Sequence, residues 1–247
     1  DRVRRVIGCV GQRSGVDREA TGRENLTLQG RIYGLRGREL HQRVHDLLER
    51  FELENVAGRL ARTYSGGMQR KLDVAMGLVP RPRVLFLDEP TTGLDPESRA
   101  TLWREITQLS EVEGVTILLT THYLEEADRL ASQLAIVDRG RVVAEGTPDQ
   151  LKAELRGDAI HVELGNPQVN GRAQHALRGV VDVHDVAIDG ATLRARVSQG
   201  SRALPEVLAV LESQGISVQS VTVSRPSLDD VYLQRAGRSF RMAEGES

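Results

Sequence analysis

The stretch Tyr64–Pro96 constrains the fold more than any other part of this sequence. It opens with Ser65-Gly66-Gly67, where serine is a favourable N-cap and glycine lets the backbone approach a ligand closely. A helix that begins in this way presents free N–H groups and a partial positive charge, which suits a phosphate. Behind this opening, apolar residues recur at helical spacing and form one face: Met68, Leu72, Ala75, Met76 and Val79.

A short apolar strand follows this helix and ends in two carboxylates. Val84–Leu87 is the all-apolar run expected of a parallel strand that is covered on both faces. It delivers Asp88 and Glu89 to the carboxyl end of the sheet, where ligands of open α/β folds bind. There Asp88 can hold Mg²⁺, and Glu89 can orient or deprotonate an attacking water. A solvated turn is the alternative, but the flanking Ser-Gly-Gly and Gly93-Leu94-Asp95 favour phosphoryl transfer.

These segments resemble the signature motif, Walker B strand and D-loop of the ATP-binding-cassette (ABC) ATPases. Thr120-Thr121-His122, after another apolar strand, resembles the H-switch of that family, and Gln12 resembles its Q-loop. The motifs stand in the family order. The wording around Ser65, with Tyr64 and Met68 as neighbours, is similar to the daunorubicin-resistance type of drug-export ATPase. Many family members have Leu and Gln at these two neighbouring positions, so a side-chain amide is missing here.

The resemblance implies an ATPase that binds ATP and Mg²⁺ and works as a head-to-tail homodimer. Glu89 and His122 would be the catalytic residues, acting on the attacking water and on the γ-phosphate. Asp88 and Gln12 would meet the Mg²⁺ that arrives with the nucleotide, and Asp95 would reach across the dimer. The residues implied to bind nucleotide are Gln12, Ser65, Gly66, Gly67, Asp88 and Asp95.

The same resemblance implies a polytopic membrane permease as the partner, and a peripheral location on the cytoplasmic side of the cell membrane. The helical part of such cassettes faces the permease, whereas the transported molecule contacts the permease itself. Multidrug or antibiotic export therefore depends on the subfamily resemblance, and lipids or other amphiphiles are equally compatible as cargo.

A phosphate-binding P-loop, Gly-x-x-x-x-Gly-Lys-Ser/Thr, does not occur in the sequence. The lysines, Lys71 and Lys152, have other surroundings. Since the P-loop of the family precedes its Q-loop, we expect the N-terminal part of the domain to be missing from this sequence. Residues 1–247 alone are then expected neither to bind ATP tightly nor to hydrolyse it. A non-catalytic interaction subunit and an ABC ATPase that serves no transporter are the alternatives.

Composition removes several other classes of function. The 33 Lys and Arg nearly balance the 35 Asp and Glu, so no net charge attracts nucleic acid. Aromatic residues make up only 3% of the chain, which argues against a stacking platform for single strands. The lone Cys9 excludes an internal disulfide. No apolar run of about 18 residues is present, so a membrane role would require a partner.

The sequence predicts an α/β protein of several parts. Residues 1–155 are expected to form an N-terminally incomplete, P-loop NTPase-like ABC ATPase domain, with a parallel sheet core and a helical subdomain over about 13–80. A capping box at Thr21 and Glu24 starts that subdomain, and Leu28, Ile32 and Leu35 follow at helical spacing. Residues 158–223 read as a βαββαβ, ferredoxin-like accessory domain. Residues 224–247 are expected to be a C-terminal helix and tail.

Overall fold

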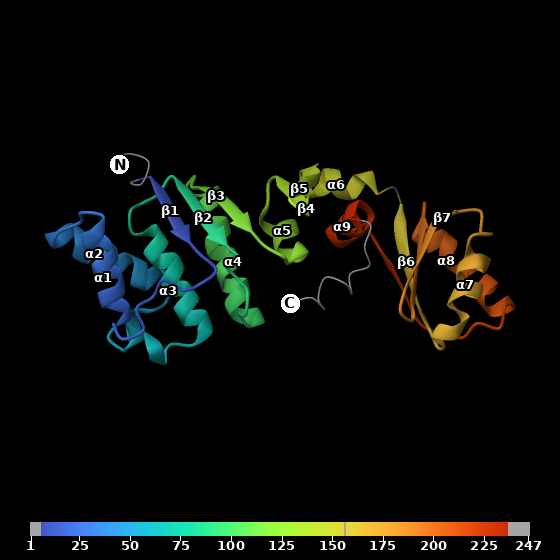
Figure 1. Ribbon diagram of the computed structural model, residues 1–247, viewed down its shortest axis with the longest axis horizontal. Helices are drawn as coiled ribbons and strands as arrows, with labels where there is room; N and C mark the ends of the chain where they lie inside the picture. Colours follow the sequence, from blue (N-terminus) through green and yellow to red (C-terminus); the bar gives the residue numbers. More distant parts are fainter. Residues whose placement is uncertain (1–5, 156, 237–247) are drawn as a thin grey trace. The chain divides into compact units, whose positions relative to one another are not determined.

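The computed structural model describes residues 6–155 and 157–236 (Figure 1). Contacts divide the chain into two compact units, Asp1–Leu130 and Ala131–Ser247. The expected division near residues 155 and 158 would instead give the hairpin and helix after residue 131 to the ATPase domain, and it stays a prediction. Residues 237–247 of the expected tail lie outside the described residues.

A parallel sheet forms the centre of the first unit. Its strands are β1 (Ile7–Val10), β2 (Val84–Asp88) and β3 (Thr116–Thr120), in the order β1-β2-β3. The register aligns Val10 with Leu87 and Leu87 with Leu119, so the three carboxyl ends meet at one edge. The expected parallel core is therefore confirmed.

The described residues of this unit form five helices: α1 (Gly22–Ile32), α2 (Gly37–Arg50), α3 (Gly66–Leu78), α4 (Pro96–Glu111) and α5 (Leu124–Leu130). Short 3-10 turns lie at Glu54–Val56 and Ala61–Thr63. The expected caps are present, since the side chains of Thr21, Ser65 and Asp95 accept from backbone N–H groups of α1, α3 and α4. One core joins the helices to the sheet, including Leu26, Leu48, Leu72, Leu85, Leu87, Leu102 and Ile106.

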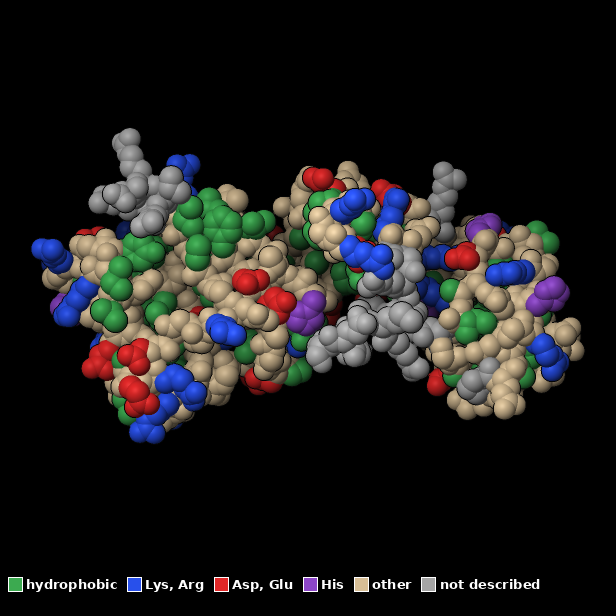
Figure 2. Space-filling view, in the orientation of Figure 1, with side chains coloured by type: hydrophobic (Ala, Val, Ile, Leu, Met, Phe, Trp, Pro, Cys, Tyr) green, Lys and Arg blue, Asp and Glu red, His purple; other side chains and the backbone are tan. Residues whose placement is uncertain are grey.

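Leu28 and Ile32, which recur at helical spacing in α1, are 57% and 68% exposed, whereas α1 turns Leu26 to the core. The expectation that the strand Val84–Leu87 is covered on both faces is wrong. β2 is covered on one face only: Leu85 and Leu87 are buried, whereas Phe86 is 37% exposed. Alternate residues of a strand point to opposite faces, and nothing among the described residues covers the second face well enough to bury Phe86. Hydrophobic side chains gather over β1, β2 and β3 on this face (Figure 2).

The second unit begins with an antiparallel hairpin, β4 (Leu134–Asp138) and β5 (Arg141–Gly146), and with α6 (Pro148–Glu154). An antiparallel sheet in the order β7-β8-β6-β9 follows. Its elements are β6 (Asp158–Leu164), a 3-10 turn at Pro167–Val169, α7 (Asn170–Leu177), β7 (Val183–Asp189), β8 (Thr192–Val197), α8 (Gly200–Ser213) and β9 (Val218–Ser224). This βαββαβ order with its sheet arrangement confirms the ferredoxin-like expectation.

The last described helix, α9 (Leu228–Ala236), packs against α6 and β5. Its Asp230 is 6% exposed and forms ion pairs with Arg194 and Arg196 of β8, the latter at 3.0 Å. Ser227 caps the helix by accepting from the Asp230 N–H at 3.2 Å. Across the described ranges, every helix is too short or too polar to cross a bilayer.

Candidate functional site

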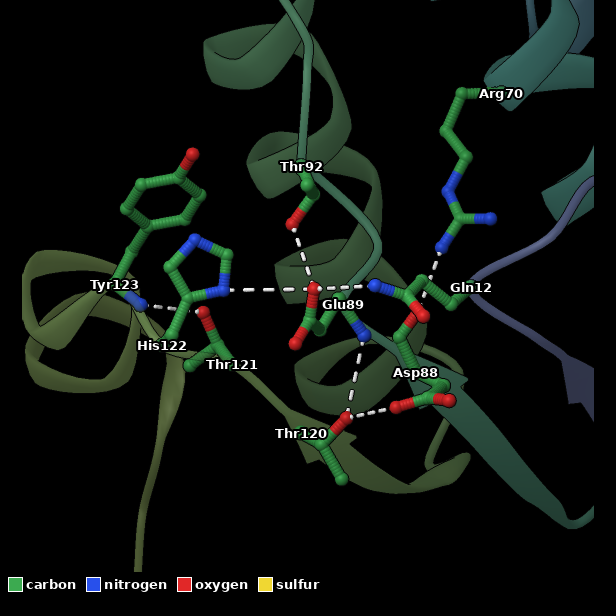
Figure 3. Close-up of polar contacts among 9 residues, drawn as sticks. All are labelled: Gln12, Arg70, Asp88, Glu89, Thr92, Thr120, Thr121, His122 and Tyr123. Atoms are coloured by element: carbon green, nitrogen blue, oxygen red, sulfur yellow. Dashed lines mark hydrogen bonds and ion pairs between the residues drawn. The ribbon is translucent and has the colours of Figure 1, made fainter. Parts of the chain in front are cut away.

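Three strand ends bring polar side chains together at one edge of the parallel sheet (Figure 3). Gln12 follows β1, Asp88 and Glu89 close β2, and His122 comes two residues after β3. The parallel register places these positions side by side, since Asp88 pairs with Thr120. Carboxyl ends of parallel strands are the usual ligand edge of open α/β sheets.

Glu89 is the centre of this cluster. Its Oε2 accepts from Gln12 Nε2 at 3.1 Å and from Thr92 Oγ1 at 3.2 Å, and it lies 3.5 Å from His122 Nδ1. The Glu89 side chain is 28% exposed and that of His122 is 52% exposed, so the group faces solvent. All three contacts involve the same oxygen, Oε2, and none of them involves Oε1.

The backbone of Glu89 is strained. Its φ is +45°, a left-handed conformation that non-glycine residues rarely adopt. Such a conformation costs on the order of 1–3 kcal/mol and persists only where neighbours hold it. The Glu89 N–H donates to Thr120 O at 3.0 Å and to Thr120 Oγ1 at 3.2 Å, which fixes one side of the residue to β3.

Asp88 lies one residue earlier, with an exposed side chain. Its Oδ1 accepts from Thr120 Oγ1 at 2.5 Å, a short and charge-assisted hydrogen bond. A carboxylate at this position suits Mg²⁺, which uses one or two protein oxygens and completes its shell with phosphates and water. Across the described residues, no cluster of three or more His, Cys, Asp or Glu side chains could hold a metal ion by itself. The single carboxylate of Asp88 fits an ion that takes one or two protein oxygens.

The start of α3 forms a second group of expected site residues. The Ser65 hydroxyl accepts from Met68 N–H at 3.2 Å, while a Cβ added at Gly66 would meet open space. A Cβ at Gly67 would collide with the Ser98 hydroxyl, so only glycine allows α4 to approach this closely. The start of α3 is therefore accessible at Gly66 and tightly packed at Gly67.

Asp95 joins this second group through the start of α4. Its Oδ1 accepts from Ser98 N–H at 2.9 Å and its Oδ2 from Ser98 Oγ at 2.7 Å. The hydrogen bonds from Ser98 hold the pKa of Asp95 below its ordinary value. The carboxylate stays charged at neutral pH and faces solvent beside the start of α3.

The two unusual neighbours of the Ser-Gly-Gly run have structural roles. Tyr64 is buried, and its hydroxyl donates to Val56 O at 2.8 Å. Its ring end lies where a Cβ on Gly22 would stand, so Tyr64 joins the start of α3 to the start of α1. Met68 packs against the core of the first unit. The departures from the common family wording therefore anchor the helix start.

Sequence reasoning missed several residues around the cluster. Thr92 and Thr120 hold Glu89 and Asp88, and Arg70 and Asp73 of α3 contact the backbone of the loop after β1 and the end of β2. A signal for the last two was present, because Arg70 and Asp73 interrupt a helix that is otherwise largely apolar. Charged residues in a buried helix require partners.

Comparison with known proteins agrees with this geometry. The family described as "ABC transporter" matches residues 1–92, and the family "ATP-binding protein DrrA1-3-like, C-terminal domain" matches residues 146–236. The daunorubicin resistance ATP-binding protein DrrA3 of Streptomyces coeruleorubidus is 46% identical over 98% of this chain and 76% of its own length. The daunorubicin/doxorubicin resistance ATP-binding protein DrrA of Streptomyces peucetius is 42% identical over 96% and 72%.

Among solved structures, the dimeric post-hydrolysis state of the ATP-binding cassette MJ0796 bound to ADP and Pi is similar, with a TM-score of 0.54 and 27% identity. The likeness covers 59% of this chain and 64% of that one, which is less than two thirds of the solved chain. The same family is indicated by the strand-end cluster, by the helix that Ser-Gly-Gly opens and by the matched relatives. This chain belongs to the ABC transporter family, among its DrrA-like ATP-binding proteins.

Proposed function

We propose that this chain is the ATP-binding and ATP-hydrolysing subunit of an ABC exporter that removes drugs or antibiotics. The observation that carries the proposal is the Glu89 carboxylate, held by Gln12, Thr92 and His122 at the ligand edge of a parallel sheet. The relatives support the direction of transport and the class of cargo, because their names describe resistance to daunorubicin and doxorubicin.

In this proposal Glu89 orients the attacking water and accepts its proton. Its Oε2 is occupied by three neighbours, so Oε1 is the oxygen that can accept a hydrogen bond from water. His122 turns Nδ1 toward Glu89 while the other ring nitrogen points away from it (Figure 3). In this proposal that nitrogen contacts the terminal phosphate, and the Glu89 contact orients the ring.

Asp88 and Gln12 are the residues that would meet Mg²⁺. The ion, when bound with ATP, neutralises negative charge on the β- and γ-phosphates. Asp88 offers a carboxylate already oriented by Thr120, and Gln12 keeps its amide nitrogen on Glu89. The side-chain oxygen of Gln12 remains to face the ion or its water.

The start of α3 completes the site from a second copy. Ser65, Gly66 and Gly67 open a helix of 13 residues whose first N–H groups favour an anion. In a head-to-tail homodimer this start would close over the phosphate bound by the partner, and Asp95 would reach across the interface. ATP then favours the closed dimer because it binds that state better, and hydrolysis releases it.

The chain would act on the cytoplasmic side of the membrane, with a polytopic permease as its partner. The helical part of the first unit would meet the permease and pass on the closure of the dimer. The permease rather than this chain would contact the cargo, which makes daunorubicin the first molecule to test.

The test is transport by the gene product that contains this chain, reconstituted with its permease in lipid vesicles. We expect daunorubicin to move only with hydrolysable ATP, and Glu89→Gln to stop both movement and hydrolysis. Ribosomes or DNA as the co-purifying partner would instead support an ABC ATPase that serves no transporter. Normal transport without any ATP hydrolysis would contradict the proposal.

A further inference from the structure

Arg70 of α3 is a buried guanidinium beside the strand-end cluster (Figure 3). It is 8% exposed and donates to three main-chain carbonyl groups. Nε donates to Pro90 O at 2.7 Å, Nη1 to Gly11 O at 2.7 Å and Nη2 to Asp88 O at 2.9 Å. A guanidinium has several donors in one rigid plane, so it can bind three separate carbonyls at once.

The positions of these carbonyls matter more than their number. Asp88 and Pro90 are the residues directly before and after Glu89, and Gly11 directly precedes Gln12. Arg70 therefore grips the backbone on both sides of Glu89, where φ is +45°. A residue other than glycine keeps a left-handed backbone conformation only when its surroundings hold it there. The hydrogen bonds of Arg70 supply part of that constraint.

Asp73, about one turn further along α3, holds the loop after β1 at a second position. It is 6% exposed, and its Oδ1 accepts from Gly15 N–H at 2.9 Å. Gln12 lies between Gly11 and Gly15 in the chain, so α3 fixes both ends of the short segment that carries this residue. Burial lowers the pKa of Arg70, and the charges of Asp73, Asp88 and Glu126 oppose that shift.

A purely structural role is the alternative, and the chain contains a good example of it. Arg43 of α2 is half-buried, and like Arg70 it donates to main-chain carbonyls, from Nη2 to Leu78 O at 2.5 Å and from Nε to Val79 O at 3.4 Å. Those carbonyls lie at the opposite end of α3, far along the helix from Ser65. Arg43 thus stabilises a helix end, whereas the Arg70 bonds end at the backbone of Asp88 and of residues adjacent to Glu89 and Gln12.

We propose that Arg70 is a positioning residue for ATP hydrolysis, which ties the helix opened by Ser65 to the backbone that carries Glu89 and Gln12. This inference rests on the proposed function. In the proposed dimer, the start of α3 contacts the nucleotide bound by the partner copy, whereas Glu89 acts on the nucleotide bound by its own copy. Arg70 therefore links the two nucleotide sites through one rigid helix. Its loss would leave the nucleotide contacts present but Glu89 displaced from the attacking water.

The test compares Arg70→Gln with Arg43→Gln in the gene product that contains this chain. Misplacing a reacting group by about 1 Å can lower a rate by about a hundredfold. We expect Arg70→Gln to lower kcat for ATP hydrolysis by roughly tenfold to a hundredfold, with KM changed by less than about threefold. Arg43→Gln is expected to lower the unfolding temperature but to keep kcat within about twofold of the unchanged protein.

A second variant keeps the test decisive if Arg70→Gln does not fold. Arg70→Lys retains the charge but offers a single nitrogen in place of the planar fork. We expect it to fold and to give an intermediate kcat, with faster hydrogen exchange in the segments 11–15 and 88–92. Equal kcat in Arg70→Lys, Arg43→Gln and the unchanged protein would overturn the inference. An unchanged protein that hydrolyses no ATP would instead overturn the proposed function.

Discussion

Each unit holds arginines that are largely withdrawn from solvent, and the two units use them differently. In the first unit Arg70 donates to backbone carbonyls, so the nearby carboxylates of Asp88 and Glu89 remain available at the sheet edge. In the second unit Arg194 and Arg196 form ion pairs with the carboxylate of Asp230, which is 6% exposed. In the first arrangement the arginine holds the main chain, whereas in the second the arginines neutralise a carboxylate and fix α9 to the sheet.

The largest expected effect comes from the carboxylate left available in the first unit. Glu89→Gln keeps the shape and the contacts of the side chain but removes the proton acceptor. Loss of a general base lowers a rate by about a hundredfold to ten-thousandfold, so we expect kcat to fall by about a thousandfold. ATP-driven dimerisation should persist, because the phosphate-binding groups are untouched. Phosphate release and gel filtration measure the two effects, and near-normal hydrolysis would remove Glu89 from the role of base.

The next effect tests whether the ion pairs of the second unit are only structural. Asp230→Ala leaves the half-buried Arg194 and Arg196 without the buried carboxylate that they contact. Breaking a buried ion pair in this way costs about 3–5 kcal/mol, and the loss should appear in hydrogen exchange of the β6–β9 amides. The control is Asp229→Ala, which removes only a charge interaction with Arg194 and no ion-pair contact, and it should change exchange less. A fall in kcat without any loss of stability would contradict the comparison.

A smaller effect is expected at the start of α3. Tyr64→Phe removes a buried hydroxyl and leaves Val56 O without its donor. The free energy of unfolding should fall by about 1–2 kcal/mol, as measured by hydrogen exchange of α3 amides. Tyr33, which is 36% exposed, provides the control variant Tyr33→Phe. Equal stability of the two variants would show that Tyr64 does not anchor the helix.

The smallest effect concerns pH and the capping box of α1. Hydrogen bonds from Thr21 hold the pKa of Glu24 below its ordinary value of 4.5. A carboxylate with a lowered folded pKa contributes stability above its unfolded pKa, and this contribution disappears as pH falls through the folded pKa. The Glu24→Gln variant should therefore unfold at a slightly lower temperature than the unchanged protein at neutral pH. The two unfolding midpoints should converge below pH 4.5, and a constant difference would exclude this mechanism.

The sequence predicted the elements whose signals are local. The caps at Thr21, Ser65 and Asp95, the parallel strands and the βαββαβ order all follow from spacing and turn chemistry. The convergence of Gln12, Glu89 and His122 was expected from family order, and the structure brings these three side chains together. Their roles in hydrolysis stay proposals.

What the sequence could not predict depends on contacts between distant segments. The bonds of Arg70 join positions 18 to 59 residues apart, and no local pattern specifies such partners. The exposed face of Phe86 was missed for a related reason, because an apolar run looks the same whether one face or both are covered. Helical spacing at Leu28 and Ile32 indicated a helix but not which of its faces is buried, because tertiary packing decides which face a helix turns to the core.

The most direct test of the central claim is a structure of the gene product carrying Glu89→Gln with ATP bound. We expect a dimer in which the terminal phosphate lies between Ser65 of one copy and the cluster of Asp88, position 89 and His122 of the other. Ser65 facing solvent, away from any nucleotide, would contradict it.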